Sequence, residues 1–176
     1  LTKSIKTLAV IGPNAHDGRN QLGDYSYAAM LNLMQFTRPE NSSFLESGPA
    51  TLVEHDIRVV TTLAGIREIV SPATKVLYAK GCDNLDDDRS GFDEAVKTVE
   101  QADAVVLVLG DRAGMTPSCT TGETRDSVDL RLPGVQEELA RAILATGKPV
   151  AVVLVNGRPF AIPWLDESAN AILEAW

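Results

Sequence analysis

The stretch Ala104-Val105-Val106-Leu107-Val108-Leu109-Gly110-Asp111 decides the fold of this chain. An apolar run that ends at a Gly-Asp pair is typical of a strand buried on both faces of a parallel sheet. No other predicted strand is as apolar, so we expect this one at the centre of the sheet. A long loop, residues 111–133, follows it.

Shorter apolar runs and amphipathic segments alternate on either side of this strand. The helix that begins after Thr61 places Leu63, Ile66, Ile69 and Val70 on one apolar face. A short connecting segment around Trp164 precedes the last strand. Alternating strands and helices predict an α/β fold: a doubly wound, mainly parallel sheet with helices on both faces, or αβα sandwich. The remaining predicted strands are 7–11, 75–80, 150–155 and 171–176, and the predicted helices are 61–70, 92–101 and 134–146.

Three long loops, residues 13–60, 82–91 and 111–133, each follow a strand, so all three should lie at the carboxyl edge of the sheet. Open α/β sheets bind ligands at that edge, and we therefore expect the functional site there. Loops 13–60 and 111–133 should be the most mobile regions, with few core contacts. Within the first of them, residues 27–36 form either a short helix or a packed flap.

Composition excludes some partners. The chain has 176 residues, enough for one domain with a sizeable core, and its net charge is −8. Nucleic acids and anionic membranes attract basic surfaces, so we expect neither as a partner. No apolar run reaches the roughly 18 residues of a membrane span.

The remaining residues of possible chemical interest have simple interpretations. Cys82 and Cys119 lie in no metal-binding pattern and are read as unpaired thiols, although a disulfide between them stays open. His16 and His55 lack metal-ligand spacing. The run of three aspartates at 86–88 is interpreted as a solvated loop, because it lacks the ligand pattern of a calcium loop. We expect no metal and no cofactor.

A nucleotide site is the first alternative function. Gly12-Pro13-Asn14 follows the first strand, but it does not form a GxGxxG motif, and proline removes an amide donor that a phosphate would use. Gly110-Asp111 does not begin a Walker loop. A GxSxG nucleophile motif is also missing from the sequence. Nucleotide binding therefore stays as a disfavoured alternative.

Glu123 is the candidate chemical residue. It lies in Cys119-Thr120-Thr121-Gly122-Glu123-Thr124-Arg125-Asp126, between small and hydroxyl side chains, in the long loop after the most apolar strand. A carboxylate at that position suits a site at the carboxyl edge of a sheet. The alternative is a solvated loop glutamate without a chemical role.

Ten short strings, collinear across nearly the whole chain, resemble the second domain of glycoside hydrolase family 3, the β-glucosidase and β-xylosidase family. Any one of these strings is weak evidence, but their common order is specific. They are AVIGPNA at 9–15, GDY at 23–25, LAGI at 63–66, YAKGC at 78–82, VLVLG at 106–110, GE at 122–123, LRLPGVQ at 130–136, ATGKPV at 145–150, NGRP at 156–159 and AILEAW at 171–176.

The resemblance implies a mechanism and a division of labour. In that family an upstream TIM-like barrel carries an Asp nucleophile, and the sandwich commonly supplies the general acid/base, which would here be Glu123. The family retains anomeric configuration, so the two carboxyls should face each other at roughly 5 Å. The candidate substrate-binding residues are Asp24, Tyr25, Asp111 and Arg125. The resemblance implies a substrate that is a β-linked glucoside, xyloside or oligosaccharide.

The resemblance also implies that residues 1–176 are a single αβα sandwich domain of a larger enzyme. The barrel and possibly the last strand would then be missing from it, and the isolated chain should be inactive. Many family members read Gly-Glu-Gly-x-Asp-Arg where this chain has Gly122-Glu123-Thr124-Arg125-Asp126-Ser127. This departure leaves the roles of Arg125 and Asp126 open. A structural or carbohydrate-binding module without a catalytic residue is the second alternative.

Overall fold

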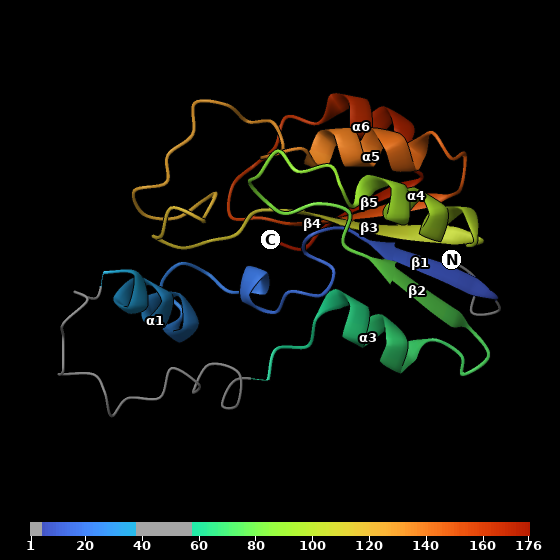
Figure 1. The fold of residues 1–176 in the computed structure, drawn as a ribbon, viewed down its shortest axis with the longest axis horizontal. Coiled ribbons are helices and arrows are strands. Elements are labelled where there is room, and N and C mark those ends of the chain that lie inside the picture. Colours follow the sequence, from blue (N-terminus) through green and yellow to red (C-terminus); the bar gives the residue numbers. More distant parts are fainter. Residues whose placement is uncertain (1–4, 38–57) are drawn as a thin grey trace.

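The strand that begins at Ala104 is the middle strand of the sheet. The computed structural model describes residues 5–37 and 58–176, and these contain a five-stranded parallel sheet in the order β2-β1-β3-β4-β5 (Figure 1). Every residue of β3 is buried, as its unbroken apolar run predicts. The strands are β1 (Thr7–Ile11), β2 (Lys75–Ala79), β3 (Ala104–Gly110), β4 (Val150–Val155) and β5 (Ala171–Glu174).

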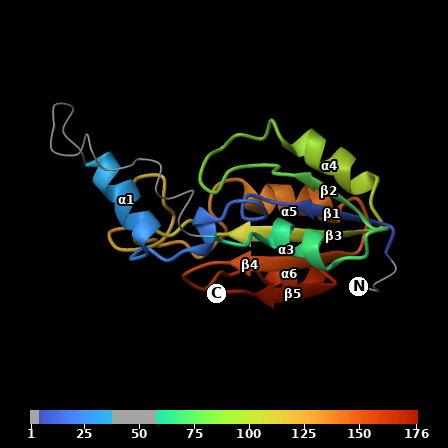
Figure 2. The same ribbon diagram turned by 90° about the horizontal axis from the view of Figure 1, so that it is seen from below.

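The predicted fold class is confirmed, with helices on both faces of the sheet. Helices α4 (Phe92–Glu100), α5 (Gln136–Leu144) and α6 (Pro163–Ser168) cover one face, and α3 (Thr62–Ile69) covers the other (Figures 1 and 2). Leu107 and Leu139 belong to the core under the three helices. Val108 and Leu63 belong to the smaller core on the side of α3.

Helix α3 begins where the sequence predicts, but one of its expected core residues is on the outside. The Thr61 hydroxyl accepts a hydrogen bond from the amide of Ala64 at 3.1 Å, which satisfies a free donor of the first turn. Leu63 is fully buried, whereas Ile69 is 82% exposed. Six residues advance a helix by about 600°, so Ile69 points about 120° away from Leu63 and misses the buried stripe.

Helix α6 is a correction to the predicted connecting segment around Trp164. Pro163 occupies the first turn, where its fixed φ angle favours a helix and its missing N–H is not needed. Leu165 is fully buried, and the guanidinium of Arg141 lies 4.2 Å from the centre of the Trp164 ring. A six-residue helix is too short to show helical periodicity in the sequence.

Helix α1 (Tyr27–Phe36) confirms the helical alternative for residues 27–36. It stands beyond the carboxyl ends of the strands, next to the loop that follows β3 (Figures 1 and 2). The Ser26 hydroxyl caps its first turn by accepting a hydrogen bond from the amide of Ala29. A single 3₁₀ turn, η1 (Arg19–Gln21), lies between β1 and α1.

Part of the predicted loop 13–60, residues 38–57, lies outside the described residues, and so does His55. Within the described ranges 5–37 and 58–176, no helix has the length and apolar character needed to cross a membrane.

Candidate active site

The order in which the chain adds strands to the sheet reverses between β1 and β3, so the carboxyl ends of these two strands form a topological switch point. The chain passes from β1 to β2 on one side and from β3 to β4 on the other, and ligands of open α/β sheets bind at such a switch point. Here buried amide side chains occupy it. The Asn14 Nδ2 atom donates to the backbone oxygens of Asp111 at 2.9 Å and Val155 at 3.2 Å. Asn20 donates to the Asn84 side chain at 2.8 Å.

Gln136, at the start of α5, completes this arrangement. Its Oε1 atom accepts from the Gly110 amide at 2.8 Å, and its Nε2 atom donates to the Gly110 oxygen at 2.8 Å. We call Asn14, Asn20, Asn84 and Gln136 the amide network. It joins the ends of β1, β3 and β4 to the loop after β2.

Close contacts between neighbouring strand ends require glycine at two positions. Gly12 and Gly110 have φ angles of 119° and 140°. A Cβ atom would lie 2.1 Å from the Val108 oxygen at the first position and 1.9 Å from the Val155 oxygen at the second. Only glycine avoids both the strained backbone and the overlap.

Asp111 anchors the loop after β3. The Thr120 hydroxyl donates to its Oδ1 atom at 2.7 Å, and the amide of Arg112 donates to the same Thr120 hydroxyl at 2.8 Å. Arg158 places a guanidinium nitrogen 3.6 Å from that carboxylate. Asp111 is only 2% exposed, and burial raises its pKa, while Thr120 and Arg158 act in the opposite direction.

The loop divides into two parts: residues 111–121, which we call the neck, contain most of its buried residues, and residues 122–131, which we call the tip, are mainly exposed. In the neck, the Gly114 amide donates to the Thr121 oxygen at 2.9 Å, and Thr116 and Cys119 are buried. This corrects the expectation that the whole of loop 111–133 has few core contacts. Residues 126–131 are exposed, as expected. The amino-acid composition of the loop does not predict which part is buried, because hydroxyl residues are common in both exposed and anchored loops.

The tip brings Glu123 to two residues that lie almost a hundred positions away in sequence. The Glu123 amide donates to Asp24 Oδ2 at 3.0 Å, and the Tyr25 hydroxyl donates to Glu123 Oε2. The hydrogen bond to Glu123 raises the pKa of Tyr25, so this hydroxyl keeps its proton at neutral pH. Glu123 itself is exposed. Asp24, Tyr25 and Glu123, which the sequence could not place relative to one another, therefore form one cluster.

Two backbone features shape this tip. Gly122 has a φ angle of 121°, and a Cβ atom there would lie 2.7 Å from the Gly114 oxygen. Thr124 has a φ angle of 64°, which is uncommon for a residue with a branched side chain. The chain therefore turns sharply on both sides of Glu123.

Arg19 is a residue that the sequence analysis did not identify. Its Nη2 atom donates to the Ala113 oxygen at 2.6 Å, and its Nε atom donates to the Asn32 side chain at 2.9 Å. It thus ties the neck of the loop to helix α1. Burial, followed by the nearby charge of Arg112, lowers the pKa of Arg19.

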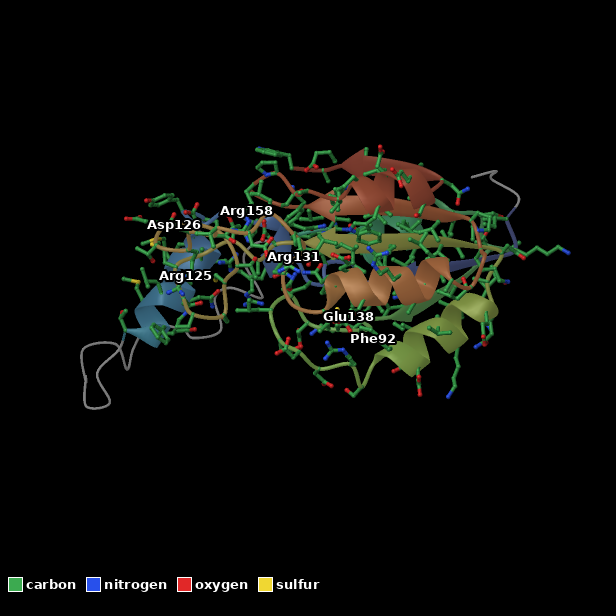
Figure 3. All side chains as sticks on the ribbon, turned by 90° about the horizontal axis from the view of Figure 1, so that it is seen from above. Phe92, Arg125, Asp126, Arg131, Glu138 and Arg158 are labelled. Carbon is green, nitrogen blue, oxygen red and sulfur yellow. The ribbon has the colours of Figure 1, made fainter. Side chains whose placement is uncertain are left out.

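The Arg125 side chain makes no hydrogen bond to Asp24, Tyr25 or Glu123. It lines a groove of about 690 Å³ between the loop and α5, together with Asp126, Arg131 and Arg158 (Figure 3). Its only side-chain hydrogen bond among the described residues goes to the Met115 oxygen at 3.4 Å. The groove begins at Thr124, next to Glu123 in the chain, and extends to the first turn of α5.

Comparison with known proteins places this geometry in a family. Residues 1–176 match the glycosyl hydrolase family 3 C-terminal domain over their whole length. The chain belongs to this family. The resemblance expected from the ten short strings is thereby confirmed.

Relatives of this glycosyl hydrolase family 3 C-terminal domain include several enzymes. A beta-xylosidase of Formosa agariphila is 41% identical over 172 residues, which are 98% of this chain and 20% of the relative. A periplasmic beta-glucosidase of Salmonella typhimurium is 33% identical over 195 residues, covering 99% of this chain and 21% of the relative. The chain thus spans about a fifth of the length of these relatives.

A solved structure is similar to this glycosyl hydrolase family 3 domain in its fold. The beta-glucosidase from Listeria innocua in complex with isofagomine has a TM-score of 0.70 to this chain at 27% identity. The match covers 100% of this chain and 20% of the beta-glucosidase.

The other residues considered in the sequence have ordinary environments in this family 3 domain. Cys82 and Cys119 are free and buried, so the reading as unpaired thiols is confirmed, and burial raises the pKa of Cys82 to about 12. His16 is exposed, with its Nδ1 atom 3.2 Å from the Thr61 hydroxyl. The aspartates at 86–88 are exposed. In the part of the chain that the structure describes, no three His, Cys, Asp or Glu side chains form a metal-binding group.

Proposed function

We propose that this chain is the αβα sandwich domain of a retaining, exo-acting β-glycosidase, and that Glu123 is the general acid/base. The substrate would be a terminal β-D-glucosyl or xylosyl residue, and an upstream TIM-like barrel would supply the nucleophile. The single observation that carries this proposal is the position of Glu123, an exposed carboxylate on an anchored loop whose side chain is oriented by Tyr25.

The retaining reaction uses a pair of carboxyl groups about 5–5.5 Å apart on either side of the scissile bond. Asp24 is hydrogen-bonded to Glu123, but it accepts this bond from the Glu123 backbone and supports the loop. The nucleophile would therefore belong to another domain. The isolated 176-residue chain would then be inactive, because it holds only one member of the pair.

Glu123 would act twice in this reaction. In the first step its carboxylic acid protonates the oxygen of the departing group while the nucleophile forms a bond to the anomeric carbon. In the second step the resulting carboxylate takes a proton from water, which attacks the same carbon and releases the nucleophile. Tyr25 donates to Oε2, which leaves Oε1 of Glu123 available for both proton transfers.

The other predicted site residues would have different roles. Asp24 and Tyr25 would orient Glu123 through the two hydrogen bonds described above. Asp111 would hold the neck of the loop through Thr120, since it is buried. Arg125 stays a candidate for substrate binding through the groove that it lines together with Thr124.

The test is Glu123→Ala in the full-length parent enzyme. Loss of the proton-transfer partner should slow each step by about 10²–10⁴-fold for substrates with poor leaving groups. A dinitrophenyl glycoside needs little protonation to depart, so its first step should survive and the glycosyl-enzyme should accumulate. Azide needs no general base, and it should restore turnover and form a β-glycosyl azide.

Glu100→Ala provides the matched control, because Glu100 is an exposed glutamate at the end of α4 and lines neither the groove nor the Glu123 cluster. It should change the rate by less than about tenfold and show no azide rescue. Equal losses of Glu123→Ala on good and poor leaving groups, without rescue, would contradict the assignment. They would favour the alternative of a module without a catalytic residue.

A further inference from the structure

The guanidinium of Arg19 donates hydrogen bonds to three separate segments of the chain. Its Nε atom donates to Asn32 Oδ1 in α1 at 2.9 Å, and its Nη1 atom donates to the Leu22 oxygen at 3.2 Å. Its Nη2 atom donates to the Ala113 oxygen in the neck at 2.6 Å. All three acceptors are neutral oxygens, so these bonds cross-link the segments and do not form ion pairs.

Two of these bonds hold the segment that contacts Glu123. The turn after Leu22 carries Asp24, which accepts a hydrogen bond from the Glu123 amide at 3.0 Å. The next residue, Tyr25, donates its hydroxyl to the Glu123 carboxylate. Helix α1 begins two residues after Tyr25, and Figure 2 shows it beside the loop that follows β3. The cross-link therefore restrains both side chains that are hydrogen-bonded to Glu123.

The third bond holds the neck of the Glu123 loop. Ala113 forms an isolated parallel bridge with Thr121, and the amide of the next residue, Gly114, donates to the Thr121 oxygen at 2.9 Å. The guanidinium packs closely here, because a Cβ atom on Gly114 would lie 2.8 Å from Arg19 Nη2. Thr121 lies two positions before Glu123, so a shift of Ala113 would also move the start of the tip.

The two segments are also in direct contact beside Glu123. A Cβ atom on Gly122 would lie 2.7 Å from the Gly114 oxygen and 3.0 Å from the Asp24 Cβ atom. The segments therefore form a closed circuit of contacts, which Glu123 completes on one side and Arg19 on the other. Loss of either contact would let the neck move relative to the turn that carries Asp24.

Only arginine can make these three bonds at once. Its planar guanidinium presents five N–H donors from three nitrogen atoms in a fixed geometry, whereas the lysine side chain ends in a single nitrogen. Lysine at position 19 would keep the positive charge but could not serve acceptors in α1, the turn and the neck together.

We propose that Arg19 is a positioning residue for Glu123, and that its guanidinium fixes the neck against the turn that carries Asp24 and Tyr25. The inference rests on the proposed function for the reaction that Glu123 performs. A general acid must lie within hydrogen-bond reach of the leaving oxygen, and a misplacement of about 1 Å can lower a rate about 10²-fold. Arg19 acts through Glu123 and does not touch the substrate.

The first test is Arg19→Lys in the full-length parent enzyme. For a glycoside with a poor leaving group, kcat/KM should fall about tenfold or more, because departure needs a correctly placed acid. For a dinitrophenyl glycoside it should fall less than about twofold, since this group departs with little protonation. A purely structural role of Arg19 would lower both values equally. Arg67→Lys is the matched control, because Arg67 is exposed in the last turn of α3, and it should change neither value.

Arg19→Ala tests whether the guanidinium itself is required. Arg19 lines a cavity of about 530 Å³, from which a small cation can enter the position of the removed side chain. Added guanidinium should therefore restore part of kcat/KM for the poor leaving group, at concentrations far below those that unfold proteins. Tyr25→Phe keeps Arg19, so guanidinium should not increase its activity. Thermal unfolding is measured for every variant, and Arg19→Lys carries the test if Arg19→Ala does not fold.

A double variant tests whether Arg19 acts through the Tyr25–Glu123 contact. If it does, Arg19→Ala combined with Tyr25→Phe should be within about twofold of Arg19→Ala alone, because residues that act through one contact are not additive. Additive losses would overturn the inference. Equal losses on good and poor leaving groups, without restoration by guanidinium, would also overturn it.

The two proposals can fail separately. If Glu123→Ala shows no azide rescue, the acid/base assignment falls, and the role of Arg19 in placing the loop stands only if guanidinium still restores Arg19→Ala. If Glu123→Ala is rescued while Arg19→Lys and Arg19→Ala behave like Arg67→Lys, the inference about Arg19 alone is wrong.

Discussion

The amide network and the tip of the Glu123 loop differ in burial and in the number of hydrogen bonds that hold them. Asn14 and Gln136 are fully buried, and each makes several hydrogen bonds to strand ends. Glu123 is exposed, and its contacts are the two hydrogen bonds to Asp24 and Tyr25. The amide network is thus held by contacts within this domain, whereas under the proposed function another domain would complete the surroundings of the Glu123 carboxylate.

The largest effect is expected for Gly110→Ala, at the strand end that the amide network contacts. The added Cβ would meet the Val155 oxygen at 1.9 Å on a backbone with φ of 140°, so we expect a loss of about 4 kcal/mol or more in the free energy of unfolding. Gly147→Ala is the control, because Gly147 also has a positive φ, 70°, but no atom within 4 Å of the added Cβ. It should cost only about 1 kcal/mol by urea denaturation. Equal losses would show that crowding at the strand ends is unimportant.

Gln136→Met tests the hydrogen bonds of the network at nearly constant volume. It leaves the Gly110 amide without its buried partner, while the Gly110 oxygen keeps the hydrogen bond from Asn84 at 3.1 Å, and we expect a loss of about 1–3 kcal/mol in the free energy of unfolding. Gln101→Met removes an exposed glutamine that donates to the Lys97 oxygen and should change stability by less than about 0.5 kcal/mol. If the two variants were equally stable, the network would not hold the strand ends as described above.

Tyr25→Phe tests the tip, where we expect the opposite pattern. The hydroxyl that orients Glu123 is lost, so kcat in the parent enzyme should fall about three- to tenfold. Tyr25 is 69% exposed, and the midpoint of thermal unfolding should not move. Tyr27→Phe, two residues later and also exposed, should leave kcat unchanged. A loss of stability without a change in kcat would show that Tyr25 supports the fold and does not orient Glu123.

Asp111→Asn gives the smallest effect and tests the link between the amide network and the tip. Burial raises the pKa of Asp111 above its usual 3.8, so the folded state binds the proton more tightly than the unfolded state. Its favourable contribution is present below the unfolded pKa and is lost as pH rises through the raised pKa. The stability of the parent chain relative to Asp111→Asn should therefore fall as pH rises through the range just above 3.8. A flat difference across this window would mean that Asp111 is not buried in solution.

The sequence predicts the sheet better than it predicts the site. Apolar runs at Thr7–Ile11 and Val150–Val155 give the strand limits, because burial on both faces leaves a continuous signal. Helix α6 has only six residues, too few to show helical periodicity in the sequence. Ile69 was predicted on the apolar face of its helix, but it is exposed.

The candidate site depends on contacts between distant segments, which no local pattern records. Glu123 can be singled out from its loop, but its pairing with Tyr25 spans 98 positions. Asp111 has the sequence surroundings of a ligand-binding residue, yet Thr120 and Arg158 enclose it. Asparagines such as Asn14 and Asn84 look like turn residues, and only the fold shows that they meet in the interior.

The order of the strands has a consequence for how this domain is made. Strand β1 is synthesised first, but its partners come much later: Leu8 pairs with Val76 on one side and with Ala104 on the other. Such distant pairings require large loops to close before any backbone bond forms, and they slow folding. An emerging chain must therefore keep an apolar strand unpaired until β2 and β3 have left the ribosome, and chaperones would have most to protect during that interval.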